Sequence, residues 1–206
     1  MRKALEHLKA ADPVLARIIE QVGPFRMTYR EPTFENLARS IVYQQLSGKA
    51  AATIYSRVAS AAGDPLTPDG ILRLSMEDLR ALGLSRQKAS YVRDLAEKAA
   101  TGEVRFDHLP ELSDEEVIAE LTQVKGIGVW TVHMFLMFAM RRPNVLPVGD
   151  LGIQNAIKAA YRMRKKPKAV DIEKRAKRWH PYCSIACWYL WRSLDVQTVE
   201  LDPSLD

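Results

Sequence analysis

Apolar residues recur along this chain with the three- to four-residue spacing of amphipathic helices, and hardly any stretch alternates as a strand would. The pattern is interrupted at glycine and proline, for example at Gly23, Gly63 and Pro143, where helices commonly end. The spacing predicts helices over residues 3–10, 13–22, 33–45, 47–61, 68–72, 76–82, 85–100, 113–123, 129–140, 150–161, 170–178 and 181–193. Only residues 25–30 and 194–199 have the composition of extended segments. We therefore expect an all-α fold.

The composition fits a globular protein that needs no metal or disulfide to fold. With 206 residues and 47% hydrophobic content, the chain is long enough to bury an adequate core. No apolar stretch could span a bilayer, and Glu6 interrupts the segment where a signal peptide would need an apolar run. Cys183 and Cys187 lie four residues apart on a predicted helix, which favours packing on a shared face over a disulfide framework. We expect a soluble protein of the cytoplasm, associated with the nucleoid in a bacterium, or of the nucleus in a eukaryote.

Positive charge is concentrated in one part of the sequence. Lys158–Arg178 contains ten basic and two acidic residues, an excess of +8, so the remainder of the chain carries −3 of the total of +5. Such a cluster is typical of a surface that binds nucleic-acid phosphates, and a solvated helical surface explains it equally well. Neutralising the cluster would distinguish these two interpretations. If the cluster contacts phosphates, its loss would make the DNA affinity less dependent on salt, whereas loss of a solvated surface would leave that dependence unchanged.

A glycine-containing turn precedes the apolar helix predicted over residues 129–140. Residues 124–128 read VKGIG, and glycine permits backbone conformations and close approaches that other residues do not. The unpaired N–H groups and the dipole at the start of the following helix attract an anion such as a phosphate. With a first helix over residues 113–123, the turn resembles a helix-hairpin-helix, although a plain structural turn fits the same chemistry.

Asp150 follows a Pro-Val-Gly loop and begins the helix predicted over residues 150–161. Aspartate is a favoured helix N-cap, and that role alone would explain the residue. The surrounding sequence supports a second role. GIGVWT at residues 126–131, followed by PVGDLGI at residues 147–153, resembles the signature of the helix-hairpin-helix, Gly/Pro-Asp superfamily of DNA base-excision glycosylases.

The resemblance covers most of residues 12–192. Residues 40–47 (SIVYQQLS) look like the family's segment that enters the DNA, and residues 79–89 look like its middle helix-turn-helix. Residues 178–192 (RWHPYCSIACWYLWR) resemble its closing motif. Within the superfamily, the chain is most similar to the alkylbase branch, 3-methyladenine DNA glycosylase II.

The resemblance implies an all-α fold of two lobes with the active site in a cleft between them. Residues 33–140 would form a central helical bundle ending in the helix-hairpin-helix of residues 113–140, and residues 1–32 and 141–206 would form a terminal lobe. The larger bacterial members carry an additional β-rich N-terminal domain. This chain looks like the compact fungal and short bacterial variants.

The expected partner is double-stranded DNA containing alkylated bases, bound by a monomer that does not associate with membranes. A damaged base must rotate out of the duplex before it can react, and an apolar wedge commonly fills the gap. Leu46 matches that wedge; without the resemblance, a buried core residue would be the default interpretation. The resemblance also implies that a group of neighbouring residues contacts DNA: Gln45, Ser47, Lys125, Gly126, Gly128 and Thr131.

The expelled base needs a binding pocket. An electron-rich indole attracts a cationic alkylpurine by about 0.5–2 kcal/mol, and Trp130 and Trp191 stand at the matching positions. Tyr43 and Met134 would complete the walls. Related proteins place an aromatic residue where this chain has Met134, which indicates a different base preference. We expect the two other tryptophans, Trp179 and Trp188, in the core.

Asp150 matches the family's catalytic carboxylate. Cleavage of an N-glycosidic bond passes through an oxocarbenium-like sugar, whose charge a carboxylate offsets. The start of a helix favours the ionised form, so we expect Asp150 to stabilise the cation or guide water and not to donate a proton. A cationic base leaves readily and needs no second acid.

Two missing features narrow the chemistry further. Superfamily members that also cut the DNA strand place a nucleophilic lysine two residues after the second hairpin glycine, where this chain has Trp130, so we expect no lyase activity. Two cysteines cannot supply the four thiolates of the iron–sulfur loop in other relatives. We expect no required cofactor and no side-chain metal site. The resemblance implies a structural sodium or potassium ion at the carbonyls of Thr122, Val124 and Ile127.

Two other functions stay open at this point. The chain could be a non-catalytic helix-hairpin-helix module that binds DNA phosphates, or an oxidised-base glycosylase of the same superfamily. Trp130 and the missing cysteine cluster disfavour the second. The chain also departs from the family at Cys183, where the closing motif usually has arginine. We expect His133, on the second hairpin helix, to be a surface or DNA-facing residue.

Overall fold

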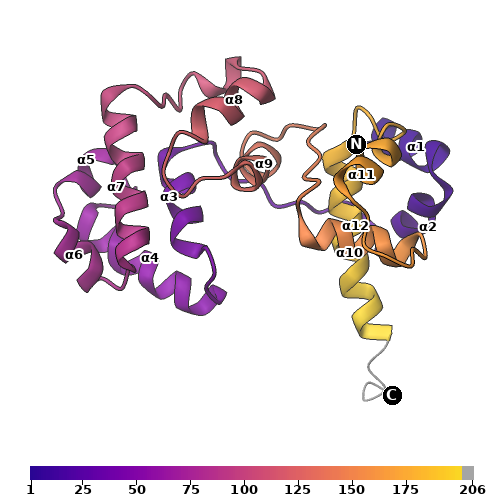
Figure 1. Cartoon of the computed structure of the whole chain (residues 1–206), viewed down its shortest axis with the longest axis horizontal. Coiled ribbons are helices and arrows are strands. Elements are labelled where there is room, and N and C mark those ends of the chain that lie inside the picture. The colour runs from indigo at the N-terminus through magenta and orange to yellow at the C-terminus, as the bar shows by residue number, and fades with distance from the viewer. Residues whose placement is uncertain (201–206) are drawn as a thin grey trace. The chain divides into compact units, whose positions relative to one another are not determined.

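Helices make up the regular secondary structure of the computed structural model, which describes the backbone of residues 1–200 and the side chains of residues 1–195. No strand occurs within that backbone, so the predicted all-α class is confirmed. Among the described residues, no helix is both long and apolar enough to cross a bilayer. The chain divides into two compact units (Figure 1).

The first unit combines Met1–Thr28 with the chain from Arg141 onward. In this unit α12 packs against both α2 and α10, so the beginning and the later part of the chain share one core. Trp179 and Tyr189 are fully buried in it. Its helices are α1 (Arg2–Ala11), α2 (Pro13–Val22), α10 (Leu151–Ala160), α11 (Ala169–Ala176) and α12 (Cys183–Glu200).

Asp12 connects the N-terminal helices of the first unit to its later segments. Its Oδ1 caps α2 by accepting hydrogen bonds from the N–H groups of Val14 and Leu15 at 3.0 and 3.2 Å. Its Oδ2 accepts from the Tyr161 hydroxyl at 2.6 Å and the Trp179 indole at 3.0 Å. Burial favours the neutral acid, but these hydrogen bonds outweigh it and hold the pKa of Asp12 below its ordinary value.

The second unit spans Tyr29–Met140. Its central helix α7 packs against α3, α5 and α6. Capping residues in the local sequence determine where these helices start. Thr67 caps α5, where Pro68 is the first helical residue, and Ser75 caps α6 in a capping box with Asp78. The elements are α3 (Phe34–Tyr43), α4 (Gly48–Ala62), α5 (Pro68–Leu72), α6 (Met76–Ala81), α7 (Arg86–Thr101), η1 (Leu109–Glu111), α8 (Asp114–Leu121) and α9 (Val129–Phe138).

Of the two segments predicted to be extended, one is helical. Residues 194–199 lie within α12, because the helix that begins at Cys183 meets no glycine or proline there that would end it. Residues 25–30 form no strand. They have no neighbouring strand to pair with, and the Arg30 N–H instead donates to the carbonyl of Phe138 at the end of α9, at 2.9 Å.

Candidate active site and DNA-contacting segments

Asp150 is the N-cap of α10, which confirms the structural part of its predicted role. Its Oδ1 accepts a hydrogen bond from the Ile153 N–H at 2.8 Å and another from the Trp191 indole at 2.8 Å. Only 8% of the residue is exposed. Because both donors converge on one oxygen, they fix the orientation of the carboxylate. Trp191, predicted to bind the base, therefore also positions Asp150.

Gly152 permits this contact between α10 and the indole. A Cβ at residue 152 would lie 2.9 Å from Trp191 Cδ1 and 3.0 Å from Asp150 Oδ1. Any larger residue would push the ring or the carboxylate away. Gly149, on the other side of Asp150, has no atom within 4 Å of an added Cβ. The close packing is therefore specific to residue 152, which the sequence pattern alone does not single out.

Ser184, buried on α12, holds the loop that leads to Asp150. Its hydroxyl accepts from the Val145 N–H at 2.9 Å and donates to the carbonyl of Arg142 at 2.6 Å. Its own N–H donates to the carbonyl of Pro143 at 3.0 Å. The loop before the carboxylate is thus anchored in the core of the first unit.

The turn between α8 and α9 has the glycine geometry of the predicted hairpin. Gly126 has a φ of +79°, and a Cβ there would lie 2.1 Å from the ring of Tyr91, so only glycine fits. Gly128 is the N-cap of α9, and an added Cβ there would meet no atom within 4 Å. The start of α9 is therefore sterically open, as a phosphate seat requires.

Lys125 is held by a carboxylate on α7. Its ammonium lies 2.9 Å from Asp94 Oδ1, and its backbone N–H donates to Asp94 Oδ2 at 2.9 Å. Burial favours the neutral acid, but these bonds hold the pKa of Asp94 below its usual range. The Lys125 side chain is still 67% exposed. Its predicted contact with a phosphate is compatible with this placement and stays a prediction.

The link between α3 and α4 presents Leu46 to solvent. Gln45 adopts a φ of 55°, and Ser47 caps α4 by accepting from the Ala50 N–H at 3.4 Å. Leu46 is 41% exposed, so the alternative interpretation as a buried core residue is wrong. An exposed leucine between two helices has the properties that a wedge needs.

Lys88 on α7 fixes the end of α3 just before this link. Its ammonium donates to the carbonyls of Val42 at 2.7 Å and Gln44 at 2.5 Å, and burial lowers its pKa. The side-chain amide of Gln44 in turn donates to the carbonyl of Gly126 at 3.0 Å. Within the second unit, these bonds connect the segment that carries Leu46 to the hairpin turn.

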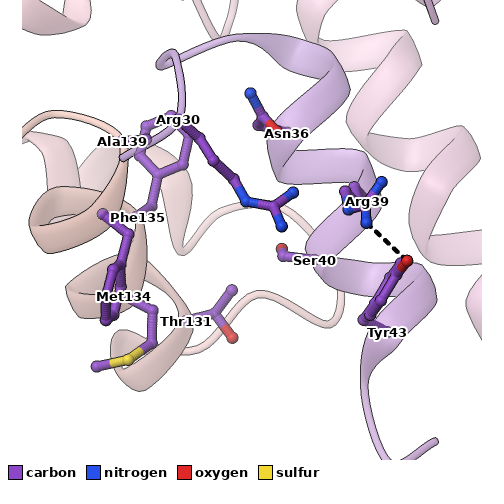
Figure 2. Close-up of a pocket in the computed structure, with 10 residues that line it drawn as sticks. Arg30, Asn36, Arg39, Ser40, Tyr43, Thr131, Met134, Phe135 and Ala139 are labelled. Carbon is purple, nitrogen blue, oxygen red and sulfur yellow. Dashed lines mark hydrogen bonds between the residues drawn. The ribbon is translucent and has the colours of Figure 1, made fainter. Parts of the chain in front are cut away.

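A pocket of about 240 Å³ lies between one face of α3 and one face of α9 (Figure 2). It brings together Tyr43 and Met134, two of the predicted base-binding residues. Arg39 donates to the Tyr43 hydroxyl at 2.7 Å, and its guanidinium lies 4.5 Å from the centre of that ring. The lining comes from α3 (Asn36, Arg39, Ser40, Tyr43), from α9 (Thr131, Met134, Phe135, Phe138), and from Arg30 and Ala139.

The two tryptophans that are predicted to bind the base lie outside this pocket, in different units. Trp130 is 50% exposed on α9 of the second unit, whereas Trp191 is half-buried on α12 of the first. Neither lines the pocket. Thr131, predicted to contact DNA, is 8% exposed and lines the pocket, and its contact with DNA stays a prediction. The expectation that the two remaining tryptophans belong to the core is confirmed for Trp179 and Trp188.

Burial keeps both cysteine thiols protonated, so neither is a reactive nucleophile. Cys183 and Cys187 are free and buried, as their spacing on one helix predicts, and burial raises the pKa of Cys183 to about 12. His133 is half-buried on α9, and burial lowers its pKa. No group of three potential His, Cys, Asp or Glu metal ligands occurs among the side chains that the structure describes.

The carbonyls that the family resemblance assigns to a monovalent cation belong to residues at the hairpin turn. Thr122 is the C-cap of α8, and Val124 and Ile127 follow it. The carbonyl of Val124 accepts from the Ile127 N–H at 3.1 Å and retains a second lone pair. Carbonyl oxygens of this kind suit a hard cation.

The basic segment Lys158–Arg178 is largely exposed, from the end of α10 through α11. Arg175 stacks on Tyr161 with its guanidinium carbon 3.8 Å from the ring centre. Arg164 and Lys165, in the linking turn, form no ion pair with any residue that the structure describes. Both interpretations of the cluster, a phosphate contact and a solvated surface, are compatible with this exposure.

Residues 38–181 match the family described as the HhH-GPD superfamily base excision DNA repair protein. Because the match spans more than half of the chain, the protein belongs to this superfamily, and the family predicted from the sequence motifs is confirmed.

The relatives are similar over nearly the whole chain. DNA-3-methyladenine glycosylase 1 of Schizosaccharomyces pombe is 36% identical over 94% of this chain and 87% of its own length. The solved DNA-3-methyladenine glycosidase of Bacillus halodurans superposes with a TM-score of 0.87 at 36% identity, covering 96% of this chain and 91% of its own. The S. pombe 3-methyladenine DNA glycosylase in complex with abasic DNA gives a TM-score of 0.80 at 36% identity, covering 92% and 95%.

Proposed function

We propose that this protein is a monofunctional DNA glycosylase that hydrolyses the N-glycosidic bond of alkylated bases in duplex DNA and so initiates base excision repair. The observation that carries the proposal is the Asp150 carboxylate, fixed by two donors at the start of α10 and beside an indole. Its relatives are named 3-methyladenine glycosylases, and one was solved in complex with abasic DNA, which supports both the reaction and the partner.

The reaction needs an anion and one water molecule. As the bond from C1′ to the base nitrogen breaks, its electron pair leaves with the base and positive charge develops on the sugar. The Asp150 carboxylate offsets this charge, and water then forms the new C1′–O bond and loses a proton. A cationic alkylated base accepts the electron pair without protonation. Asp150 therefore acts as an electrostatic group and not as the acid.

Three segments would prepare the nucleotide for this step. The open start of α9 at Gly128 would hold a phosphate, with Lys125 beside it. Leu46 would enter the duplex and occupy the space of the expelled base. Tyr43 and Met134, with the exposed indole of Trp130, would contact the base. A monomer suffices for these contacts, and the protein would act where the cell keeps its DNA.

Trp130 also accounts for the proposed absence of lyase activity. Strand cleavage by this superfamily requires an amine that forms a Schiff base with the sugar, and an indole nitrogen cannot form one. Borohydride should therefore trap no covalent complex between the protein and DNA containing the lesion. A borohydride-dependent adduct of protein and DNA would contradict this part of the proposal.

A sodium or potassium ion at the carbonyls of Thr122, Val124 and Ile127 would stabilise the hairpin turn without taking part in the chemistry. Lithium in place of potassium should then weaken DNA binding at constant ionic strength. Equal affinities in the two salts would contradict the cation site.

The experiment that tests the function is a panel of duplexes, each with one defined lesion, incubated with wild-type protein and with Asp150→Asn. The asparagine oxygen can still accept from the Ile153 N–H and from the Trp191 indole, so the variant should fold and bind DNA. Base release by wild type alone is the expected result. DNA binding without release of any base by wild type would instead identify a non-catalytic binding module, and release of oxidised bases alone would place the protein in another branch.

A further inference from the structure

Arg30 extends its guanidinium into the pocket between α3 and α9 (Figure 2). The backbone bond from its N–H to the carbonyl of Phe138, at 2.9 Å, fixes the residue against the end of α9. The guanidinium forms no hydrogen bond or ion pair with any residue of the described part of the chain. Its N–H donors are therefore available to a ligand in the pocket.

The charged lining of this pocket is entirely cationic. Arg30 and Arg39 line it, and no Asp or Glu is among the described residues that do. Arg39 already has a partner within the protein, because it donates to the Tyr43 hydroxyl at 2.7 Å and stacks on that ring. The Arg30 guanidinium has no such partner among the described residues. A guanidinium carries five N–H donors and no acceptor. A ligand that hydrogen-bonds to Arg30 must therefore offer an acceptor.

The pocket has the size and the wall for a purine. At about 30 Å³ per water molecule, its volume of about 240 Å³ equals that of roughly eight waters, which is room for one base. Met134 and Phe135 supply an apolar wall. Trp130 precedes Met134 by one helical turn, so its exposed indole lies on the same side of α9.

We infer that Arg30 determines base specificity by favouring alkylated purines that carry a carbonyl oxygen at C6, such as 7-methylguanine, over those that carry an amino group there, such as 3-methyladenine. The inference rests on the proposed function. At C6 guanine presents the O6 acceptor, to which an arginine N–H can donate, whereas adenine presents the N6 donor, which the guanidinium cannot pair with. Because Arg30 is exposed, water satisfies its remaining N–H groups, and the discrimination comes from the hydrogen bond gained with O6. Both lesions are cations, so repulsion by the guanidinium acts on both and does not separate them.

The test uses DNA treated with a methylating agent, which contains both lesions in one sample. Wild type, Arg30→Met and Arg26→Met are incubated with it, and the released 3-methyladenine and 7-methylguanine are quantified together, with a sample lacking protein as the blank. Arg26→Met is the matched control, because it removes an exposed arginine that lines no pocket described here. While release is still linear in time, the ratio of the two bases is independent of how much of each variant is folded.

Arg30→Met should raise the ratio of 3-methyladenine to 7-methylguanine by about tenfold, as expected for the loss of one specific contact between arginine and a base. Arg26→Met should leave it unchanged. Arg30→Met should also slow release from a duplex with a single hypoxanthine, a neutral purine with the same carbonyl. An unchanged ratio in Arg30→Met, or the same shift in both variants, would overturn the inference and leave the proposed function intact. Wild-type protein that releases neither base would overturn both.

Discussion

Replacing Gly152 by alanine would test whether the contact between Trp191 and Asp150 positions the reactive carboxylate. A Cβ at this residue would lie 2.9 Å from Trp191 Cδ1 and 3.0 Å from both Trp191 Nε1 and Asp150 Oδ1. These separations are about 0.5 Å shorter than the optimum of about 3.5 Å for non-bonded carbon atoms. Because an indole ring is rigid, the ring and the carboxylate would have to move apart.

Two effects of opposite sign decide the stability of this variant. Within a helix, alanine is favoured over glycine by about 0.5–1 kcal/mol, whereas crowding of a packed site costs about 1–3 kcal/mol. We expect a net loss of about 1 kcal/mol, which lowers Tm by about 2–4 °C in a chain of this size. The larger effect is expected on the rate of base excision. A misplacement of about 1 Å can cost about 100-fold in rate, so half that displacement predicts a fall in kcat of about tenfold.

The assay is single-turnover excision from a duplex with one alkylated base, with DNA affinity and Tm measured in parallel. Gly149→Ala is the matched control, because it lies directly before Asp150 and its Cβ would meet no atom within 4 Å. It should retain the wild-type rate and Tm. A Gly152→Ala variant that is as active as wild type and more stable would show that helix propensity alone governs the site. Equal losses in the two variants would assign the effect to the loop and not to the indole contact.

Three further substitutions test other parts of the molecule. Leu46→Ala should slow base flipping, followed by a fluorescent base analogue, yet change stability by no more than about 0.5 kcal/mol, and a large fall in Tm would contradict an exposed wedge. Lys88→Met should lower excision by about fivefold, through loss of the two charged hydrogen bonds to Val42 and Gln44, with Lys88→Arg partly restoring it; an unchanged rate would mean that other contacts hold the wedge segment. Asp12→Asn should lower unfolding free energy at pH 7 by about 3 kcal/mol. The pKa of Asp12 is depressed in the folded state. The stability advantage of wild type over Asp12→Asn should therefore be complete above about pH 4 and vanish as the pH falls below that folded pKa. Urea titrations that give the same advantage at pH 7 and pH 2 would contradict this role of Asp12.

Local signals in the sequence determine most of the helix boundaries. The bounds of α5 follow from Thr67 as a cap and Pro68 as the first helical residue, and the spacing of apolar residues predicts α2 from Pro13 to Val22. Asp150 is predicted both as a cap and as the reactive group from its place in one motif. By contrast, α12 continues through residues 194–199 because no glycine or proline ends it there. The short alternation of polar and apolar residues in that segment led to the wrong prediction of an extended structure.

Contacts between distant residues could not be predicted in the same way. Gly152 looks like any helical glycine until the Trp191 ring is placed against it. Lys88 looks like a solvent-exposed helical lysine, and only the fold brings the carbonyls of Val42 and Gln44 to it. Arg30 lies in the segment predicted to be extended, and nothing in that segment's composition indicates the pocket that α3 and α9 form beside it. Periodicity and capping act over a few residues, whereas these roles come from tertiary packing.

The most direct test of the central claim compares wild type and Asp150→Asn at saturating protein on a duplex with one 7-methylguanine. Under single-turnover conditions the rate constant reports the chemical step, and affinity for the same duplex is measured separately. The account predicts DNA binding within about twofold of wild type and a rate lower by about 100-fold or more, the order expected for loss of a preorganised charge next to the reacting bond. An Asp150→Asn variant that binds this DNA and releases the base at the wild-type rate would contradict it.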